Sequence, residues 1–188
     1  MTTFQVRPPA AEPVTLAQAR AFLRIDGSDE DEVVAGLIRA ACRYVETETR
    51  RALMAQGWRT VVAGRALRRP VTLSPGPLIA VSVVTAYDAG GTPAVLAAGQ
   101  WRLETGAAAP AVVLSPEAAR HAVNGVEIDF DAGFGSTAEA VPQPLIQALL
   151  MLVAHWYEHR EAVALGVAAG AVALGVAALT APYRAVRL

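Results

Sequence analysis

The segment that most constrains the fold is the apolar stretch 142–161. The prolines at its start suit the first turn of a helix, where a missing N–H costs nothing and the fixed φ helps. Within residues 145–157 only Gln147 and His155 are polar, so this helix would be apolar around almost its whole circumference. Such a helix is either packed on most sides or embedded in lipid. Because charged residues follow at 158–161, we predict a buried central helix that other elements surround.

Two more helices are predicted before residue 58. Thr15 and Gln18 form a capping-box pattern at the start of the first helix. We expect Ser28 to cap the second, with the acidic residues 29–32 in its first turn and Arg50 near its C-terminus, as the helix dipole favours. Consecutive carboxylates on a helix point in different directions, so dipole complementation is preferred over a metal site for the acidic run. The predicted buried stripe comprises Val34, Leu37, Ile38, Ala41 and Val45.

From Trp58 onward the periodicity changes to that of short strands. The turn signals Pro-Gly, Gly-Gly and Asn-Gly separate them. In the last strand Val126, Ile128 and Phe130 alternate with acidic residues, which predicts a half-buried antiparallel strand. The predicted strands are 58–63, 70–74, 79–87, 100–104, 111–114 and 125–130.

Strands framed by helices, without βαβ alternation, indicate an α+β fold. We predict an α-helical core of three main helices, the last one central and buried, with an inserted antiparallel β region and an extended C-terminal tail. The predicted parts are an N-terminal arm (1–14), the helical core (15–57 and 140–161), the β region (58–139) and an Ala/Gly/Val-rich segment with the tail (162–188).

Composition excludes several classes of protein. The chain has 188 residues, is 54% hydrophobic and carries a net charge of −1, so it can form a core but has no global basic field for nucleic acid. A single cysteine, Cys42, excludes an internal disulfide and a cysteine-based zinc cluster. The N-terminus has no apolar h-region, so we expect no secretory signal and synthesis in the cytoplasm.

One motif could indicate catalysis. His155, Glu158 and His159 match H-x-x-E-H, the inverted zinc-peptidase signature. Zinc needs a third protein ligand, and the only acid after the motif, Glu161, is too close on the same helix. We therefore prefer a structural role for the motif over a zinc hydrolase. We predict no catalytic residue, no metal and no cofactor.

The segment 162–181 has no charged residue and contains a near-perfect nine-residue duplication, 162–170 and 171–179. Its length suffices to span a bilayer, and it contains a G-x-x-x-G match. Ala and Gly dominate, however, and an aromatic belt is lacking. We therefore expect either a packed helix of small residues or a flexible linker here. A membrane-anchored protein that uses 162–181 is kept as the alternative function.

Several segments together resemble the head–tail connector (adaptor) proteins of long-tailed phages and gene transfer agents. They follow the family order and span most of the chain, although the duplicated Ala-Gly-Val segment departs from the family pattern. The segments are E-P-V-T-L-A-Q-A-R-A-F-L-R-I-D-G-S-D-E-D-E, I-R-A-A-C-R-Y-V-E-T-E-T-R-R-A-L-M-A-Q-G-W-R, L-S-P-G-P-L-I-A-V-S-V-V, Q-W-R-L, D-F-D-A-G-F-G, V-P-Q-P-L-I-Q-A-L-L-M-L-V-A-H-W-Y-E-H-R-E and A-P-Y-R-A-V-R-L.

The resemblance implies a structural subunit, not an enzyme, at the head–tail interface of a virion or gene transfer agent particle made in a bacterial cytoplasm. Adaptors of this kind form a homo-oligomeric ring of about twelve copies, a dodecamer, beneath the portal protein. The ring extends the channel for double-stranded DNA without sequence-specific contacts. It also docks the next tail-side connector or stopper protein, and no membrane is implied.

Two sets of residues are candidates for these contacts. Ring subunits make heterologous contacts, so their two flanks must complement each other. The inter-subunit candidates are Asp29, Glu30 and Asp31 on one flank and Arg39, Arg43, Arg50 and Arg51 on the other. The resemblance suggests that the tail contacts the portal, whereas a frayed terminus is the alternative. The tail candidates are Pro182, Tyr183, Arg184, Val186, Arg187 and Leu188.

Overall fold

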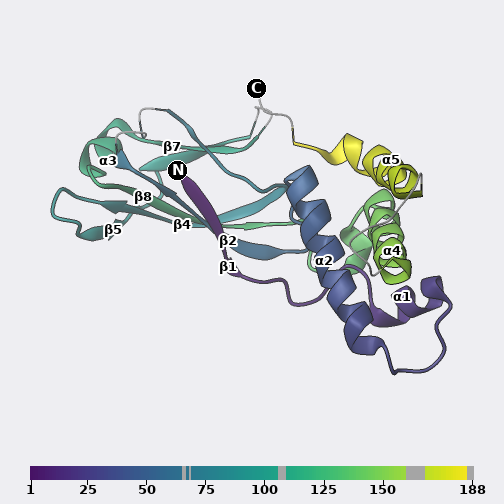
Figure 1. The fold of residues 1–188 in the computed structure, drawn as a ribbon. Coiled ribbons are helices and arrows are strands. Elements are labelled where there is room, and N and C mark those ends of the chain that lie inside the picture. Colours follow the sequence, from purple (N-terminus) through teal and green to yellow (C-terminus); the bar gives the residue numbers. More distant parts are fainter. Residues whose placement is uncertain (65–66, 68, 106–108, 160–167, 186–188) are drawn as a thin grey trace. The chain divides into compact units, whose positions relative to one another are not determined.

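The computed structural model describes the whole chain except residues 65–66, 68, 106–108, 160–167 and 186–188; for 168–173 it describes the backbone only (Figure 1). The chain divides into two compact units, which are described separately below. The sheet unit comprises Met1–Pro9, Ala55–Gly133 and Ala185–Leu188, and the helical unit comprises Ala10–Met54 and Phe134–Arg184. Helices and antiparallel sheets together make this an α+β fold, as the sequence predicts.

The described residues of the helical unit form four α-helices, one more than the three main helices predicted. They are α1 (Leu16–Leu23), α2 (Asp31–Thr49), α4 (Gln143–Glu158) and α5 (Ala168–Thr180), with the short 3-10 helices η2 (Ala138–Ala140) and η3 (Ala181–Tyr183). The fourth, α5, begins within the Ala/Gly/Val-rich segment. Residues 162–167 of that segment lie outside the described residues.

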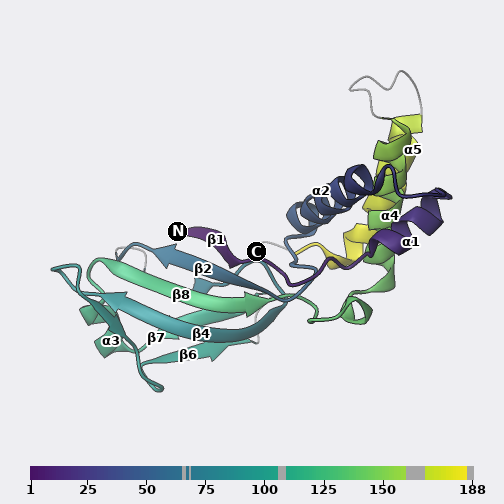
Figure 2. The same ribbon diagram turned by 90° about the horizontal axis from the view of Figure 1, so that it is seen from below.

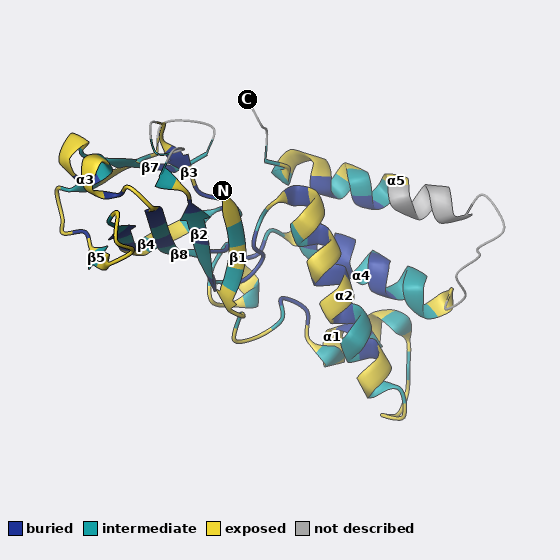
Figure 3. Cartoon of the chain, turned by 60° about the vertical axis from the view of Figure 1, so that its left-hand side comes forward, coloured by how far each residue is buried: buried dark blue, intermediate teal, exposed yellow. Residues whose placement is uncertain are grey.

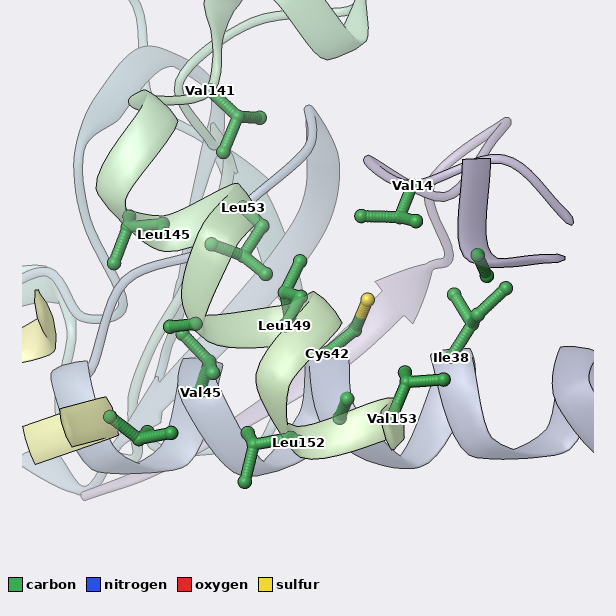
Figure 4. Packing of buried hydrophobic residues seen from close by; sticks show 14 of the residues in the cluster. Val14, Ile38, Cys42, Val45, Leu53, Val141, Leu145, Leu149, Leu152 and Val153 are labelled. Carbon is green, nitrogen blue, oxygen red and sulfur yellow. The ribbon is translucent and has the colours of Figure 1, made fainter. Parts of the chain in front are cut away.

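Helix α4 is the centre of the helical unit, as its apolar sequence predicts. It contacts α1, α2 and α5, and Figure 4 shows its side chains meeting those of α2. The largest of its fully buried residues are Leu145 and Leu149, so α4 supplies much of the core. Its burial is less complete than predicted, because Ile146, Leu150 and Trp156 are only half-buried. Figure 3 shows such intermediate positions along α4.

A local signal explains where α1 begins, but the predicted signal for α2 fails. The Thr15 hydroxyl accepts from the Gln18 N–H and the Gln18 side chain accepts from the Thr15 N–H, which confirms the capping box. The predicted Ser28 cap is wrong. Glu30 is the N-cap residue of α2 and makes no side-chain cap bond. Ser28 lies before the helix, in a turn in which its carbonyl accepts from the Asp31 N–H.

The described strands of the sheet unit are β1 (Thr2–Arg7), β2 (Gln56–Val62), β3 (Val71–Thr72), β4 (Leu78–Tyr87), β5 (Pro93–Val95), β6 (Trp101–Glu104), β7 (Ala111–Leu114) and β8 (Gly125–Ala132). They form two antiparallel sheets, ordered β1-β2-β8-β4-β5 and β3-β7-β6 (Figure 2). A short helix, α3 (Pro116–His121), contacts β4 and β7, which belong to different sheets.

Strand β8 lies in the middle of the larger sheet and shows the predicted alternation. Val126, Ile128 and Phe130 are almost fully buried, whereas the acidic residues between them are half-buried. Because paired residues of antiparallel strands point to the same face, the register Thr60↔Ile128↔Val84 extends this buried face across β2 and β4. The core of the sheet unit therefore lies on one face of β8.

Three elements of the sheet unit were not predicted as such: β1, β5 and α3. Residues 2–7, expected as part of an extended arm, form an edge strand that pairs with β2. At the start of α3 the Ser115 hydroxyl accepts from the Ala118 N–H, and Pro116 occupies the first turn. Both features favour the start of a helix, although this helix is only six residues long.

No helix among the residues that the structure describes is long and apolar enough to cross a membrane.

Candidate functional site

The tail candidates begin where α5 ends. The Thr180 side chain is buried and its hydroxyl donates to the Val176 carbonyl at 3.0 Å. The 3-10 helix η3 follows directly, so Pro182 and Tyr183 belong to it and not to an extended peptide. The backbone becomes extended only at Arg184. Val186, Arg187 and Leu188 lie outside the described residues.

Tyr183 and Arg184 contact the helical unit itself. The Tyr183 ring packs edge-on against Phe134, with centroids 6.3 Å apart and an interplanar angle of 83°. The Tyr183 carbonyl accepts from the Arg51 Nε–H at 3.0 Å, and the Arg184 guanidinium donates to the Glu48 carboxylate at 2.8 Å. We name this set of five residues the tail clamp.

The tail clamp depends on how α2 ends. Arg50 adopts a left-handed conformation, φ 54°, which turns the chain away from the helix axis. The buried Thr49 hydroxyl donates to the Val45 carbonyl and accepts from the Arg51 N–H. These bonds fix the backbone from which the Arg51 side chain reaches the tail.

The acidic inter-subunit candidates differ in their surroundings. Asp29 is exposed. The Glu30 carboxylate accepts a hydrogen bond from the Tyr157 hydroxyl of α4, and the Asp31 carboxylate pairs with Arg20 of α1 at 3.4 Å. Glu30 and Asp31 therefore hold the start of α2 against its neighbours, which leaves Asp29 as the most accessible of the three.

The arginine candidates also divide into two kinds. Arg39, Arg43 and Arg50 are exposed on or just after α2, and Arg43 pairs with Glu46 on the same helix at 3.3 Å. Arg51 is half-buried in the tail clamp. Figure 3 shows exposed positions along the outer face of α2.

A second charged cluster lies on the face of the larger sheet opposite its core. Arg59 of β2 donates from Nε and Nη2 to the two carboxylate oxygens of Asp129, and its Nη1 lies 3.4 Å from Glu127. A hydrogen bond to the Glu127 carboxylate raises the pKa of the Tyr87 hydroxyl. The alternation of β8 predicts where these carboxylates point, but their basic partner comes from a strand 70 residues away.

The H-x-x-E-H motif lies at the C-terminal end of α4. The rings of His155 and His159 lie against each other, 4.7 Å between centroids, at the polar end of α4. Across the described part of the chain, no group of three His, Cys, Asp or Glu side chains is placed to hold a metal ion. Cys42 is a core residue of the helical unit, and its burial, together with the neighbouring Glu12 carboxylate, raises the pKa of its thiol well above the ordinary value.

Comparison with known proteins decides the family. The profile described as phage gp6-like head–tail connector protein matches residues 13–88. A chain from the neck of an empty gene transfer agent (GTA) particle, computed with C6 symmetry, is 30% identical with a TM-score of 0.81, covering 100% of this chain and 97% of that one. The chain belongs to the phage gp6-like head–tail connector family.

Two further solved chains match this connector over the same lengths, 100% of this chain and 97% of theirs. One comes from the virion of a native GTA particle, with 30% identity and a TM-score of 0.79. The other comes from the neck of a native GTA particle computed with C12 symmetry, with 31% identity and a TM-score of 0.80. No curated protein matches the connector. The family assigns it a structural role and no enzymatic one, as the sequence resemblance implies.

Proposed function

We propose that the connector forms a closed ring of about twelve copies in the neck of a phage or gene transfer agent particle. The observation that carries this proposal is the full-length match, at 31% identity, to a chain of a GTA neck computed with C12 symmetry. In this ring each subunit makes heterologous contacts with two neighbours. The ring continues the DNA channel below the portal and presents a platform to the next tail-side connector or stopper protein.

Ring contacts are proposed between Asp29, just before α2, and the exposed arginines on or just after this helix. Asp29 precedes the helix, whereas Arg39, Arg43 and Arg50 project from it or follow it. Opposite charges across a ring interface mainly fix the partner and the register. Reversing the charge in Asp29→Arg should impair ring formation, and Arg50→Glu in the same chain should restore it. Ring formation that withstands Asp29→Arg would refute this contact.

The channel is proposed to pass double-stranded DNA without reading its sequence. A net charge of −1 provides no strong attraction for phosphate groups, which suits a conduit through which DNA must slide. This function requires no membrane and no partner outside the particle. The connector would work at the head–tail interface after synthesis in the bacterial cytoplasm.

The portal is proposed to receive the C-terminal tail. The tail leaves the helical unit at Arg184, where the backbone becomes extended, and short extended peptides can add to a sheet edge or fill a groove. The test compares binding of the full chain and of a chain ending at Arg184 to the portal protein of the same particle, by biolayer interferometry. The shortened chain should keep its thermal unfolding curve and lose portal binding; unchanged binding would refute the tail's role.

A further inference from the structure

We propose that Glu48, Arg51 and Phe134 are positioning residues that fix the start of the C-terminal tail on the helical unit. Tyr183 and Arg184 then bind residues of their own subunit in the tail clamp, and they do not contact the portal. The inference deepens the proposed portal interaction and rests on it. It also narrows the tail candidates to the residues after Arg184.

The three contacts of the clamp are chemically independent. The Arg51 Nε–H binds a backbone carbonyl, so this contact fixes the course of the main chain at residue 183 whatever side chain is present there. The Phe134–Tyr183 contact is aromatic, and the Glu48–Arg184 contact is ionic. Together the three contacts hold Tyr183 through its backbone carbonyl and its ring, and Arg184 through its charged side chain.

The residues that hold the tail lie on backbone that is itself fixed by hydrogen bonds. Glu48 lies in the last turn of α2, and Arg51 lies two residues after the end of that helix. The Phe134 N–H donates to the Leu53 carbonyl at 3.2 Å, and Leu53 is 1% exposed. The clamp is therefore built on backbone that the core already holds.

The ionic and aromatic contacts of the clamp differ in their exposure to water. The side chains of Arg184 and Glu48 are 47% and 41% exposed, so their ion pair is screened by water. The ring contact is better shielded, because both Tyr183 and Phe134 are half-buried. Fixing the start of the tail lowers the entropy lost when the rest of it binds, which raises affinity without adding a contact to the partner.

A charge swap in the full chain tests the ionic contact. Glu48→Arg and Arg184→Glu should each weaken binding to the portal protein about fivefold, and the double variant should restore it. Arg102→Glu is the matched control, since Arg102 forms an exposed pair with Glu104 in the sheet unit. If Arg184 touches the portal directly, Arg184→Glu weakens binding, Glu48→Arg does not, and the swap stays weak; that pattern would overturn the proposal.

Hydrogen exchange of the free connector tests the clamp without any portal. The Arg184 N–H donates to the Ala181 carbonyl at 3.3 Å and should exchange slowly in the unmodified chain. Tyr183→Ala should speed its exchange about tenfold while α2 amides keep their protection, and Tyr183→Phe, which retains the ring, should behave like the unmodified chain. Fast exchange at Arg184 in the unmodified chain would overturn the clamp. Failure of that chain to bind the portal would instead overturn the proposed function.

Discussion

Arg59 on β2 binds both carboxylate oxygens of Asp129 on β8, with Nε–Oδ1 and Nη2–Oδ2 distances of 2.6 and 2.8 Å. The same guanidinium lies 3.4 Å from Glu127, two residues along β8. Two carboxylates on one face of a strand repel each other unless a cation lies between them. Arg59 therefore compensates the charge that the alternation of β8 places on this face.

Replacing this arginine should destabilise the larger sheet. Arg59→Ala leaves Glu127 and Asp129 side by side, and we expect a loss of about 1 kcal/mol in the free energy of unfolding, with part of the loss restored by Asp129→Asn. Urea unfolding followed by circular dichroism measures it. Arg102→Ala, which removes a more exposed pair, should cost less. Equal losses in the two variants would contradict the argument.

Gly125 should tolerate no side chain. Its φ is +127°, and a Cβ there would lie 2.2 Å from the Val62 carbonyl oxygen. Backbone strain and the clash together should cost about 3 kcal/mol or more in Gly125→Ala. Gly91 has a φ of +81°, but no atom lies within 4 Å of a Cβ placed there. Gly91→Ala therefore measures the backbone strain without a clash, and it should cost about 1 kcal/mol. Thermal unfolding of the two variants gives the comparison, and similar losses would show that the clash is relieved.

The central helix gives a test of the helical core. Leu149 is 1% exposed at the centre of α4, and Leu149→Ala should lower the free energy of unfolding by about 2–5 kcal/mol, since it removes apolar burial and leaves a cavity. Gln147 is exposed on the same helix, and Gln147→Ala should change stability by about 0.5 kcal/mol or less. Chemical denaturation measures both. A small effect of Leu149→Ala would mean that α4 is not the core of this unit.

The turn between β4 and β5 should loosen in acid. The Asp88 carboxylate accepts from the Thr92 and Gly90 backbone N–H groups, each at 2.8 Å, and these bonds lower the pKa of Asp88 below its ordinary value. Because the folded pKa is the lower one, this stabilisation is present above the unfolded pKa and is lost as pH falls through the folded one.

Hydrogen-exchange protection of the Gly90 and Thr92 amides should therefore be constant above about pH 5 and should fall below about pH 4. Asp88→Asn keeps an acceptor oxygen but no titratable group, so its protection should not depend on pH in this range. The same acid loss in Asp88→Asn would assign the effect to another group.

The parts of the fold that sequence predicts well are those with strong local periodicity. The apolar circumference of residues 145–157 predicts α4, and the alternation through Phe130 predicts which face of β8 is buried. The parts that sequence misses depend on partners. Residues 2–7 become a strand because β2 offers an edge, and Ser28 fails as a cap because the chain makes one more turn before α2.

In the candidate site too, local sequence predicts less than the contacts between distant segments determine. Charge and position make Arg51 a candidate for a ring contact and Tyr183 a candidate for the portal contact, but they do not predict the hydrogen bond that joins these two residues. Arg51 and Tyr183 are 132 residues apart, and their hydrogen bond uses a backbone carbonyl that every residue carries. Local sequence carries no signal for such a contact. The tail clamp forms because the tertiary fold of the helical unit brings α5 and η3 against α2.

The most direct test of the connector assignment is the mass of the full-length chain by multi-angle light scattering, alone and mixed with the portal protein of the same particle. We predict that the connector joins the portal in a complex whose added mass corresponds to a closed ring of about twelve copies. A connector that stays separate from the portal at every mixing ratio, with both proteins folded, would contradict the account.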